Sequence, residues 1–378
     1  MKASELPTPY FIVYEDKLRR NLALISHVAR ESGAKIIMAF KANALWRSFD
    51  IVREYCADCT ASSLNEMRLG RECLGGEVHT YSPAYTDANI DEYLSGSTHI
   101  TFNSLSQLER FGEKAKAAGV SVGLRVNPMC SVIETDLYNP ALPGSRFGVS
   151  SEDLDAAGLP DTVEGLHFHA LCESTSYDLE KVLAAYEERF GKYVDRLRWV
   201  NMGGGHLMTR KDYDTEHLIR VIRAFRERHQ GVQVILEPGS AFSWQTGNLV
   251  TSVVDVVEDR GITTAIIDAS FACHMPDTLE MPYLPEVAEC VAPEKSDGKR
   301  YRLGGNSCLS GDFKGDYFFA SAPKPGDKIT LLDMNHYTNV KTTMFNGVAH
   351  PDVVLEHSDG EAEYLRRYTY EDYKNRMC

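Results

Sequence analysis

Short apolar runs rich in β-branched residues alternate with segments of helical period over the first two thirds of the chain. Runs of this length, bounded by polar or glycine-containing turns, are typical of buried parallel strands. They predict eight strands, at residues 35–40, 58–62, 77–82, 99–103, 121–127, 165–170, 198–202 and 233–237. Because the strands alternate with helices, we expect an α/β fold of the (β/α)8 TIM-like barrel type over residues 14–242.

Two intervening segments give the clearest helical patterns. Residues 177–196 place Leu179, Val182 and the apolar positions that follow on one face, which predicts an amphipathic helix. A second helix is expected over 104–118, with Ser104 as its N-cap.

The pattern changes near residue 243, where helical periods become rare. Short alternating runs separated by Gly, Pro and Asp predict a mostly antiparallel β domain, with strands at residues 251–257, 264–268, 301–303, 328–333 and 353–356. Residues 6–13 form a further apolar run that we expect to pair with them. The second domain should therefore combine residues 1–13 and 243–378 as a β-sandwich or β-barrel.

Composition narrows the class of protein. The 378 residues are 43% hydrophobic and carry a net charge of −14, which is typical of a globular protein and unlike a nucleic-acid binder. Such acidity suits a small cationic ligand. Nine cysteines are too few and odd in number for a disulfide framework, and neither a secretory signal nor a membrane span is recognisable. We therefore expect a cytoplasmic protein without membrane partners.

Chemistry-bearing residues follow several of the predicted strands, at the end where barrel enzymes place their sites. Lys41 directly follows the first strand, and desolvation there would make its amine a competent Schiff-base nucleophile; alternatively the side chain reaches solvent. His167 and His169 alternate along the sixth strand and could bind a metal, stack on a flat cofactor, or simply pack. No further cysteine or histidine cluster completes a zinc site, so no metal is expected.

The last two strands end in groups that suit a phosphorylated ring. Gly203, Gly204 and Gly205 could cradle a phosphate with unobstructed amides, or form a plain turn. Glu237, which precedes Pro238 and Gly239, could pair with a protonated ring nitrogen or be a surface acid. Further along, Cys308 in a Gly/Ser-rich loop is a candidate acid or nucleophile, and Tyr337 could donate to a phosphate; either could also pack inertly.

Taken in order along the chain, these residues resemble the motifs of the fold-type III pyridoxal-phosphate decarboxylases, the family of ornithine and diaminopimelate decarboxylases. The resemblance implies an alanine racemase/ornithine decarboxylase-like fold with pyridoxal 5'-phosphate as cofactor. Lys41 would bind the cofactor covalently, His169 would stack on its ring, and Glu237 would keep the ring nitrogen protonated. Its phosphate would be held by Gly203, Gly204, Gly205, Gly239 and Tyr337.

The resemblance also implies a homodimer with shared active sites, in which Cys308 and Asp312 of a second subunit complete the site. Cys308 would return a proton to the substrate carbon after carbon dioxide departs. Arg125 and Arg146 lie in segments that approach the cofactor in relatives. Both are secondary candidates.

Within the family, residues 167–173, 201–206 and 274–283 resemble the branch that acts on carboxylated polyamines. This implies decarboxylation of carboxynorspermidine or carboxyspermidine to norspermidine or spermidine in polyamine biosynthesis. The cationic nitrogens of such a substrate require carboxylates at graded distances, for which the candidates are Asp277, Glu280, Asp312 and Glu173.

Three other functions remain open from the sequence. The substrate could be another basic amino acid, such as diaminopimelate, ornithine or arginine, although Thr60, Leu171-Cys172 and Ser240 depart from those enzymes. A metal-dependent barrel hydrolase would use His167 and His169, but it leaves Lys41 and the glycine run unexplained. A catalytically silent cofactor carrier would not require Cys308 or a whole β domain.

Overall fold

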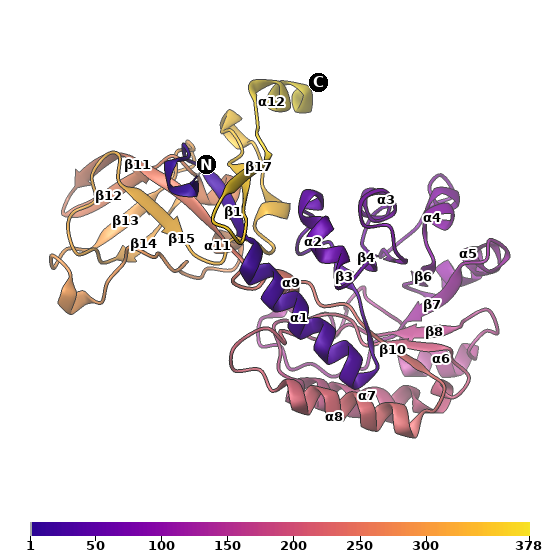
Figure 1. The fold of residues 1–378 in the computed structure, drawn as a ribbon. Helices are drawn as coiled ribbons and strands as arrows, with labels where there is room; N and C mark the ends of the chain where they lie inside the picture. The colour runs from indigo at the N-terminus through magenta and orange to yellow at the C-terminus, as the bar shows by residue number, and fades with distance from the viewer. Residues whose placement is uncertain (1) are drawn as a thin grey trace. The chain divides into compact units, whose positions relative to one another are not determined.

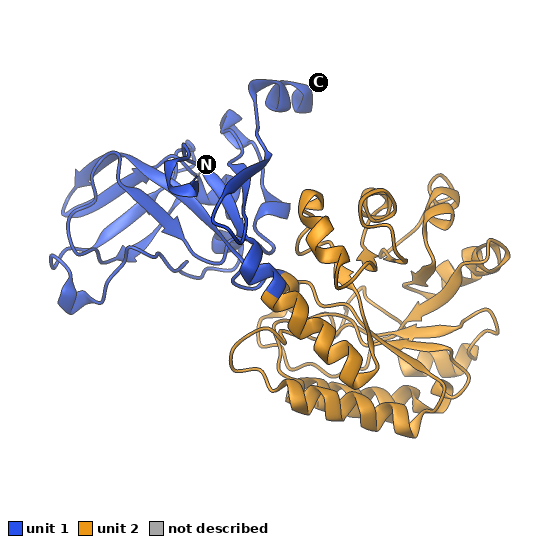
Figure 2. Cartoon of the chain, viewed as in Figure 1, with its two compact units in different colours: residues 1–19, 243–378 blue, residues 20–242 orange. Residues whose placement is uncertain are grey.

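The computed structural model describes residues 2–378 and divides into two compact units, coloured separately in Figure 2. One unit comprises Met1–Arg19 with Ser243–Cys378, and the other comprises Arg20–Phe242. The chain thus leaves the first unit after its N-terminal strand and returns to it after the second unit is complete.

The unit formed by Arg20–Phe242 is built on a barrel of parallel strands. In order around the barrel, beginning beside β10, these are β2 (Lys35–Ile36), β10 (Gln233–Leu236), β9 (Trp199–Asn201), β8 (Gly165–His167), β7 (Ser121–Arg125), β6 (His99–Phe102), β5 (Val78–Tyr81), β4 (Cys59–Ala61) and β3 (Met38–Ala39). β2 and β3 are two halves of one strand interrupted at Ile37, because β2 pairs with β10 and β3 pairs with β4. This closes the barrel and confirms the predicted fold class.

Helices follow the strands in this unit (Figure 1). They are α1 (Glu15–Ser32), which begins in the other unit, α2 (Phe49–Arg53), α3 (Leu64–Leu69), α4 (Ile90–Gly96), α5 (Leu105–Ala117), α6 (Ser151–Ala157), α7 (Ser176–Val194), α8 (Thr215–Arg228) and α9 (Ser240–Ser243). Ser104 caps α5 by accepting a hydrogen bond from the amide of Gln107, as the sequence predicts. α7 buries the predicted stripe that includes Leu179 and Val182.

One large ring fills part of the barrel interior. Trp199 is buried, and its indole Nε1 donates to Ser121 Oγ at 2.9 Å. The ring fits because Gly123 and Gly165, on the two strands before β9, have no side chains. A Cβ at Gly165 would overlap the Trp199 ring atoms. Close packing here therefore depends on glycine.

Substituting Gly165→Ala should destabilise the protein by about 1–3 kcal/mol, because the added methyl group overpacks the barrel interior against Trp199. Urea unfolding of the purified variant measures the change. Gly191→Ala is the matched control, since its Cβ would meet only Glu187 Cβ at 3.9 Å. In helix α7 this change should be neutral or stabilising by up to about 1 kcal/mol. Equal stability of Gly165→Ala and the wild type would contradict the packing described for Trp199.

The other unit is a mixed, mostly antiparallel sheet with a hydrophobic core of its own. Its strands are β1 (Tyr10–Tyr14), β11 (Gly247–Asp259), β12 (Ile262–Ile267), β13 (Tyr301–Gly304), β14 (Phe313–Tyr317), β15 (Lys328–Leu331), β16 (Asp352–Glu356) and β17 (Ala362–Arg366), and its helices are α10 (Phe271–His274), α11 (Asp277–Glu280) and α12 (Tyr370–Met377). β1 pairs antiparallel with β11 and parallel with β16, so the N-terminal run returns to this sheet as predicted.

Within residues 2–378, no helix is both long and apolar enough to cross a membrane.

Candidate active site

A cavity of about 690 Å³ opens at the carboxyl ends of the barrel strands. Part of its wall comes from the long connection between β7 and α6, which carries the secondary candidate Arg146. Its other lining residues come from six strands or the turns that follow them, and they are Ala39, Lys41, Thr60, Ser62, Tyr81, Pro83, Arg125, His167, His169 and Glu237. The structure therefore brings together three predicted site residues, Lys41, His169 and Glu237.

Lys41 lies in the turn directly after β3. Its side chain is accessible because it projects into the cavity, while the surrounding protein removes much of its hydration. Burial accordingly lowers the pKa of Lys41 below its ordinary value, with Glu237 opposing the shift. A lysine in this setting has a larger neutral fraction at pH 7 than a surface lysine. This is the state that a nucleophilic amine needs.

His169 follows β8 and has a defined tautomer. Its Nδ1 accepts a hydrogen bond from the amide of Gly204 at 2.8 Å, so the ring proton lies on Nε2 when the ring is neutral. Burial and the neighbouring Lys41 lower the pKa of His169 well below its ordinary value. The ring is therefore a neutral, oriented plane in the cavity wall.

Arg125 supports the backbone that carries His169. Its guanidinium is buried, donates to the carbonyl of His169 at 3.3 Å, and stacks on the rings of Tyr81 and Phe147. A secondary candidate in the sequence thus has a clear positioning role in the structure.

Glu237 follows β10 and is held from one side by an asparagine. Glu237 Oε1 accepts from Asn201 Nδ2 at 2.7 Å, and Asn201 Oδ1 accepts from the amide of Gly203 at 2.8 Å. Burial alone raises the pKa of Glu237, but His167 and the Asn201 amide outweigh it, and the net shift is downward. The carboxylate is ionised at neutral pH. Asn201 has a role that the sequence did not predict, because an asparagine inside a strand has no distinctive signal.

The glycine run after β9 is required by close packing. Gly203 and Gly205 have φ values of 72° and 85°, and a Cβ on Gly204 would lie 2.5 Å from the carbonyl oxygen of Glu237. Two of the three predicted phosphate donors are already used, since Gly203 and Gly204 donate to Asn201 and His169. Only the amide of Gly205 remains a candidate phosphate donor from this run.

Gly239 lets the turn after β10 approach the turn that carries Lys41. A Cβ at Gly239 would lie 2.6 Å from Ala42 Cβ. The predicted cofactor-binding glycine therefore contributes to the site by allowing two of its turns to pack together.

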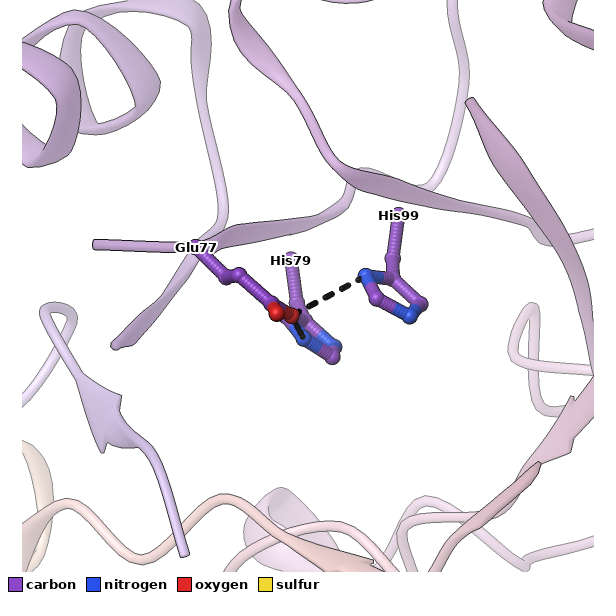
Figure 3. A group of neighbouring side chains, drawn as sticks. All are labelled: Glu77, His79 and His99. Carbon is purple, nitrogen blue, oxygen red and sulfur yellow. Dashed lines mark ion pairs between the residues drawn. The ribbon is translucent and has the colours of Figure 1, made fainter. Parts of the chain in front are cut away.

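The metal-hydrolase alternative finds no support in the positions of His167 and His169, since the Nδ1 of His169 is occupied by an amide proton. Within residues 2–378, the group with metal-ligand geometry is Glu77, His79 and His99 (Figure 3). It lies toward the amino ends of β5 and β6, away from the cavity mouth. The two ring centroids are 3.8 Å apart and the ring planes differ by 12°, so the lone pairs, which lie in the ring planes, are held in two nearly parallel planes that do not converge on one ion.

Glu77 is instead part of a charge network. Its carboxylate contacts Lys35 Nζ at 2.5 Å and His79 Nε2 at 3.5 Å, and Lys35 also contacts Asp58 at 3.1 Å. His79 and Lys35 lower the pKa of Glu77 to about 2. A carboxylate whose folded-state pKa is depressed stabilises the protein above its ordinary pKa, and that contribution is lost as the pH falls toward the depressed value.

Glu77→Gln should therefore destabilise the protein at pH 7 and progressively less as the pH falls from about 5 toward 3. The difference at pH 7 should stay below about 1 kcal/mol, because the carboxylate is half exposed to solvent. Urea unfolding at several pH values measures it. A difference that does not change with pH would contradict the network described for Glu77.

Two predicted residues of the unit that contains Ser243–Cys378, Cys308 and Asp312, belong to one short loop between β13 and β14. Cys308 is exposed, and its amide donates to Asn346 Oδ1 at 2.8 Å. Asp312 is buried, and its carboxylate accepts from Ser270 Oγ at 2.8 Å, from the Ala272 amide at 2.9 Å and from Ser307 Oγ at 2.6 Å. These bonds use most of its acceptor capacity. Asp312 thus fixes the loop that carries Cys308, whereas the sequence assigned it to a substrate amine.

Asp277 and Glu280 converge on one cation within the same unit. Lys341 Nζ lies 2.7 Å from Asp277 Oδ1 and 2.6 Å from Glu280 Oε2. The two carboxylates can therefore hold a single ammonium. Tyr337 also belongs to this unit, with a left-handed φ of 54°, and Glu173 is an exposed residue of the barrel unit with φ 48°.

Comparison with known proteins identifies the family. A family model described as the pyridoxal binding domain of pyridoxal-dependent decarboxylases matches residues 15–244. The chain belongs to the pyridoxal-dependent decarboxylases. The predicted family, and with it the enzyme class of a carboxy-lyase, is confirmed.

Two curated members of this decarboxylase family are similar over the whole chain. A carboxyaminopropylagmatine decarboxylase from Synechocystis sp. is 46% identical over 376 residues, covering 100% of this chain and 97% of the relative. A carboxynorspermidine/carboxyspermidine decarboxylase from Campylobacter jejuni is 44% identical, covering 98% and 99%.

Solved decarboxylase structures agree with these relatives. A crystal structure of carboxynorspermidine decarboxylase from Campylobacter jejuni, complexed with norspermidine, has a TM-score of 0.90 and 43% identity, covering 98% of this chain and 100% of that one. A diaminopimelate decarboxylase from Helicobacter pylori has a TM-score of 0.84 at 17% identity, which shows a shared fold.

Proposed function

We propose that this protein decarboxylates carboxynorspermidine and carboxyspermidine, releasing norspermidine and spermidine in polyamine biosynthesis. The observation that carries the proposal is the full-length similarity, at a TM-score of 0.90, to a carboxynorspermidine decarboxylase solved with norspermidine. The net charge of −14 is compatible with a substrate that carries several cationic nitrogens.

The residues of the cavity fit pyridoxal 5'-phosphate as the cofactor. The site offers an amine of lowered pKa for its aldehyde, a neutral imidazole plane for its ring, and a buried carboxylate for its ring nitrogen, in Lys41, His169 and Glu237. The close approach of Gly203–Gly205 to neighbouring backbone leaves no room for side chains. When bound, this cofactor supplies the electron sink that makes loss of carbon dioxide possible.

The chain's own residues would then bind, orient and protonate. In our proposal Lys41 binds the cofactor, Gly205 and Tyr337 contact its phosphate, and Glu237 holds the ring nitrogen protonated. Cys308, presented by a second subunit of a homodimer, returns a proton to the carbon that has lost carbon dioxide. We propose Asp277 and Glu280, with Glu173, as the carboxylates for the substrate amines, because the first two already surround an ammonium in Lys341.

A second candidate substrate is carboxyaminopropylagmatine, which is favoured by the 46% identity to the Synechocystis enzyme. The two candidates differ at the distal end, where agmatine carries a planar guanidinium and the polyamines carry an ammonium. Two carboxylates converging on one nitrogen suit the ammonium, whereas a guanidinium is best bound by a parallel pair of oxygens.

Carbon dioxide release from a panel of substrates tests the proposal. The panel contains carboxynorspermidine, carboxyspermidine, carboxyaminopropylagmatine, diaminopimelate and ornithine, each assayed with the holoenzyme. We expect the highest kcat/KM with the first two. A tenfold preference for the agmatine derivative would establish the second candidate, and turnover of diaminopimelate alone would overturn both.

A further inference from the structure

An unexplained buried imidazole lies beside the carboxylate that we assign to the ring nitrogen. His167 ends strand β8, is 2% exposed and lines the same cavity as Lys41 and Glu237. Within the described residues, neither its Nδ1 nor its Nε2 has a hydrogen-bond partner. Buried polar atoms are nearly always partnered, so two unpartnered atoms on one ring call for a physical explanation.

The geometry around His167 points to one partner. Its Nε2 lies 3.6 Å from Glu237 Oε2, a few tenths of an ångström beyond a hydrogen bond. The other carboxylate oxygen, Oε1, is fixed by Asn201, so Oε2 is the oxygen free to face both His167 and the cavity. The Tyr81 ring packs edge-on against the imidazole at 5.4 Å and restrains it in this place.

The protonation states of the pair agree with donation from the ring. Burial lowers the pKa of His167 to about 4, so the ring is neutral at pH 7 and carries one proton to donate. Glu237 is the acceptor, since its pKa lies below the ordinary value. The pair therefore combines a neutral donor with an ionised acceptor, the two states that a hydrogen bond between them requires.

We propose that His167 is a positioning residue that acts through Glu237, donating from Nε2 to Oε2 and keeping this carboxylate oriented toward the cavity. This inference rests on the proposed function, since it assumes that Glu237 faces a cofactor ring nitrogen. A hydrogen bond to the carboxylate makes it a weaker base. The shared proton then stays on the ring nitrogen, where the electron sink requires it.

A double-mutant cycle tests this role, using His167→Leu, Glu237→Gln and the combined variant. The first measurement is the dissociation constant of pyridoxal 5'-phosphate, obtained from the absorbance of the cofactor as it is titrated into each apoprotein. We expect His167→Leu to weaken binding about tenfold in the wild-type background, as for the loss of a hydrogen bond to a charged group. In the Glu237→Gln background the same change should alter binding less than twofold.

The second measurement is turnover of the best substrate by the loaded variants. His167→Leu should lower kcat with little change in KM, and His167→Gln, which keeps a donor, should recover most of the loss. Tyr186→Phe is the matched control, because it removes another buried, unpartnered polar atom of this unit that does not line the cavity, and it keeps the ring that packs on Phe168. Its kcat should equal that of the wild type.

The outcomes separate the inference from the proposed function. Equal effects of His167→Leu in both backgrounds, or no recovery with His167→Gln while the variant still folds, would overturn the role of His167. Failure of the wild type to bind the cofactor at Lys41 would instead overturn the proposed function, whatever the cycle shows.

Discussion

Replacing Lys41 with alanine should reduce decarboxylation by at least about 10³-fold, because the variant loses the nucleophile that we assign to covalent cofactor binding. The structure supports this large effect, since Lys41 is the lysine that lines the cavity and its pKa is lowered by burial. The apparent affinity for pyridoxal 5'-phosphate should also fall. Carbon dioxide release at saturating cofactor measures the first effect, and absorbance titration measures the second.

Two controls make the Lys41→Ala result specific. Lys192 lies on the surface of helix α7 and pairs with Asp155 of helix α6. The Lys192→Ala variant should retain full activity. Added methylamine should restore part of the activity of Lys41→Ala, since it can replace the missing amine in the enlarged cavity. A Lys41→Ala variant with more than a tenth of the wild-type activity would contradict the assigned role.

Cys308→Ala should lower product formation by about 10²–10⁴-fold, the usual range for loss of a general acid, while the cofactor stays bound. The loop that carries Cys308 is fixed independently of its thiol. Asp312 accepts hydrogen bonds from Ser270, from the Ala272 amide and from the hydroxyl and amide of Ser307, and Asn346 holds the Cys308 amide. Loss of the sulfur should therefore leave the loop in place.

Product analysis and cofactor absorbance, recorded on the same Cys308→Ala preparation, measure this prediction. Cys378→Ala is a suitable control, because this exposed cysteine at the C-terminus has no assigned role. Full activity of Cys308→Ala would remove Cys308 from the reaction. Loss of bound cofactor would show that its effect is on cofactor retention and not on proton return.

Asp312→Asn tests the loop itself and complements the cysteine variant. The amide can accept at only one of its two positions, so the hydrogen bonds from Ser270 and Ala272 cannot both be kept. We expect activity to fall toward that of Cys308→Ala, with less than additive effects in the double variant. Additive effects would indicate separate roles for the two residues.

The barrel was predictable because each of its strands is an apolar run with its own polar boundaries. The predicted strands at residues 121–127 and 165–170 contain the observed β7 and β8. The first strand was predicted as continuous, whereas the structure interrupts it at Ile37. At this point its hydrogen bonds change from β10 to β4, a property of barrel closure that a local pattern does not encode.

The site was predictable where a residue type stands at a strand end, as for Lys41 and Glu237. Residues that act through others were missed, because their roles depend on contacts between distant segments. Asn201 joins Glu237 to Gly203, and Lys341 meets Asp277 from more than 60 residues away. No spacing rule in one sequence marks such pairs. The amides of Gly203 and Gly204 likewise looked free in the sequence, and the structure shows them in use.

The central claim is that Lys41 binds pyridoxal 5'-phosphate covalently within the barrel cavity. Borohydride reduction of the holoenzyme, followed by proteolysis and mass spectrometry of the peptides, tests it most directly. We predict a single phosphopyridoxyl group, located on Lys41. A reduced protein in which Lys41 is unmodified, with the label on another lysine or absent, would contradict the account.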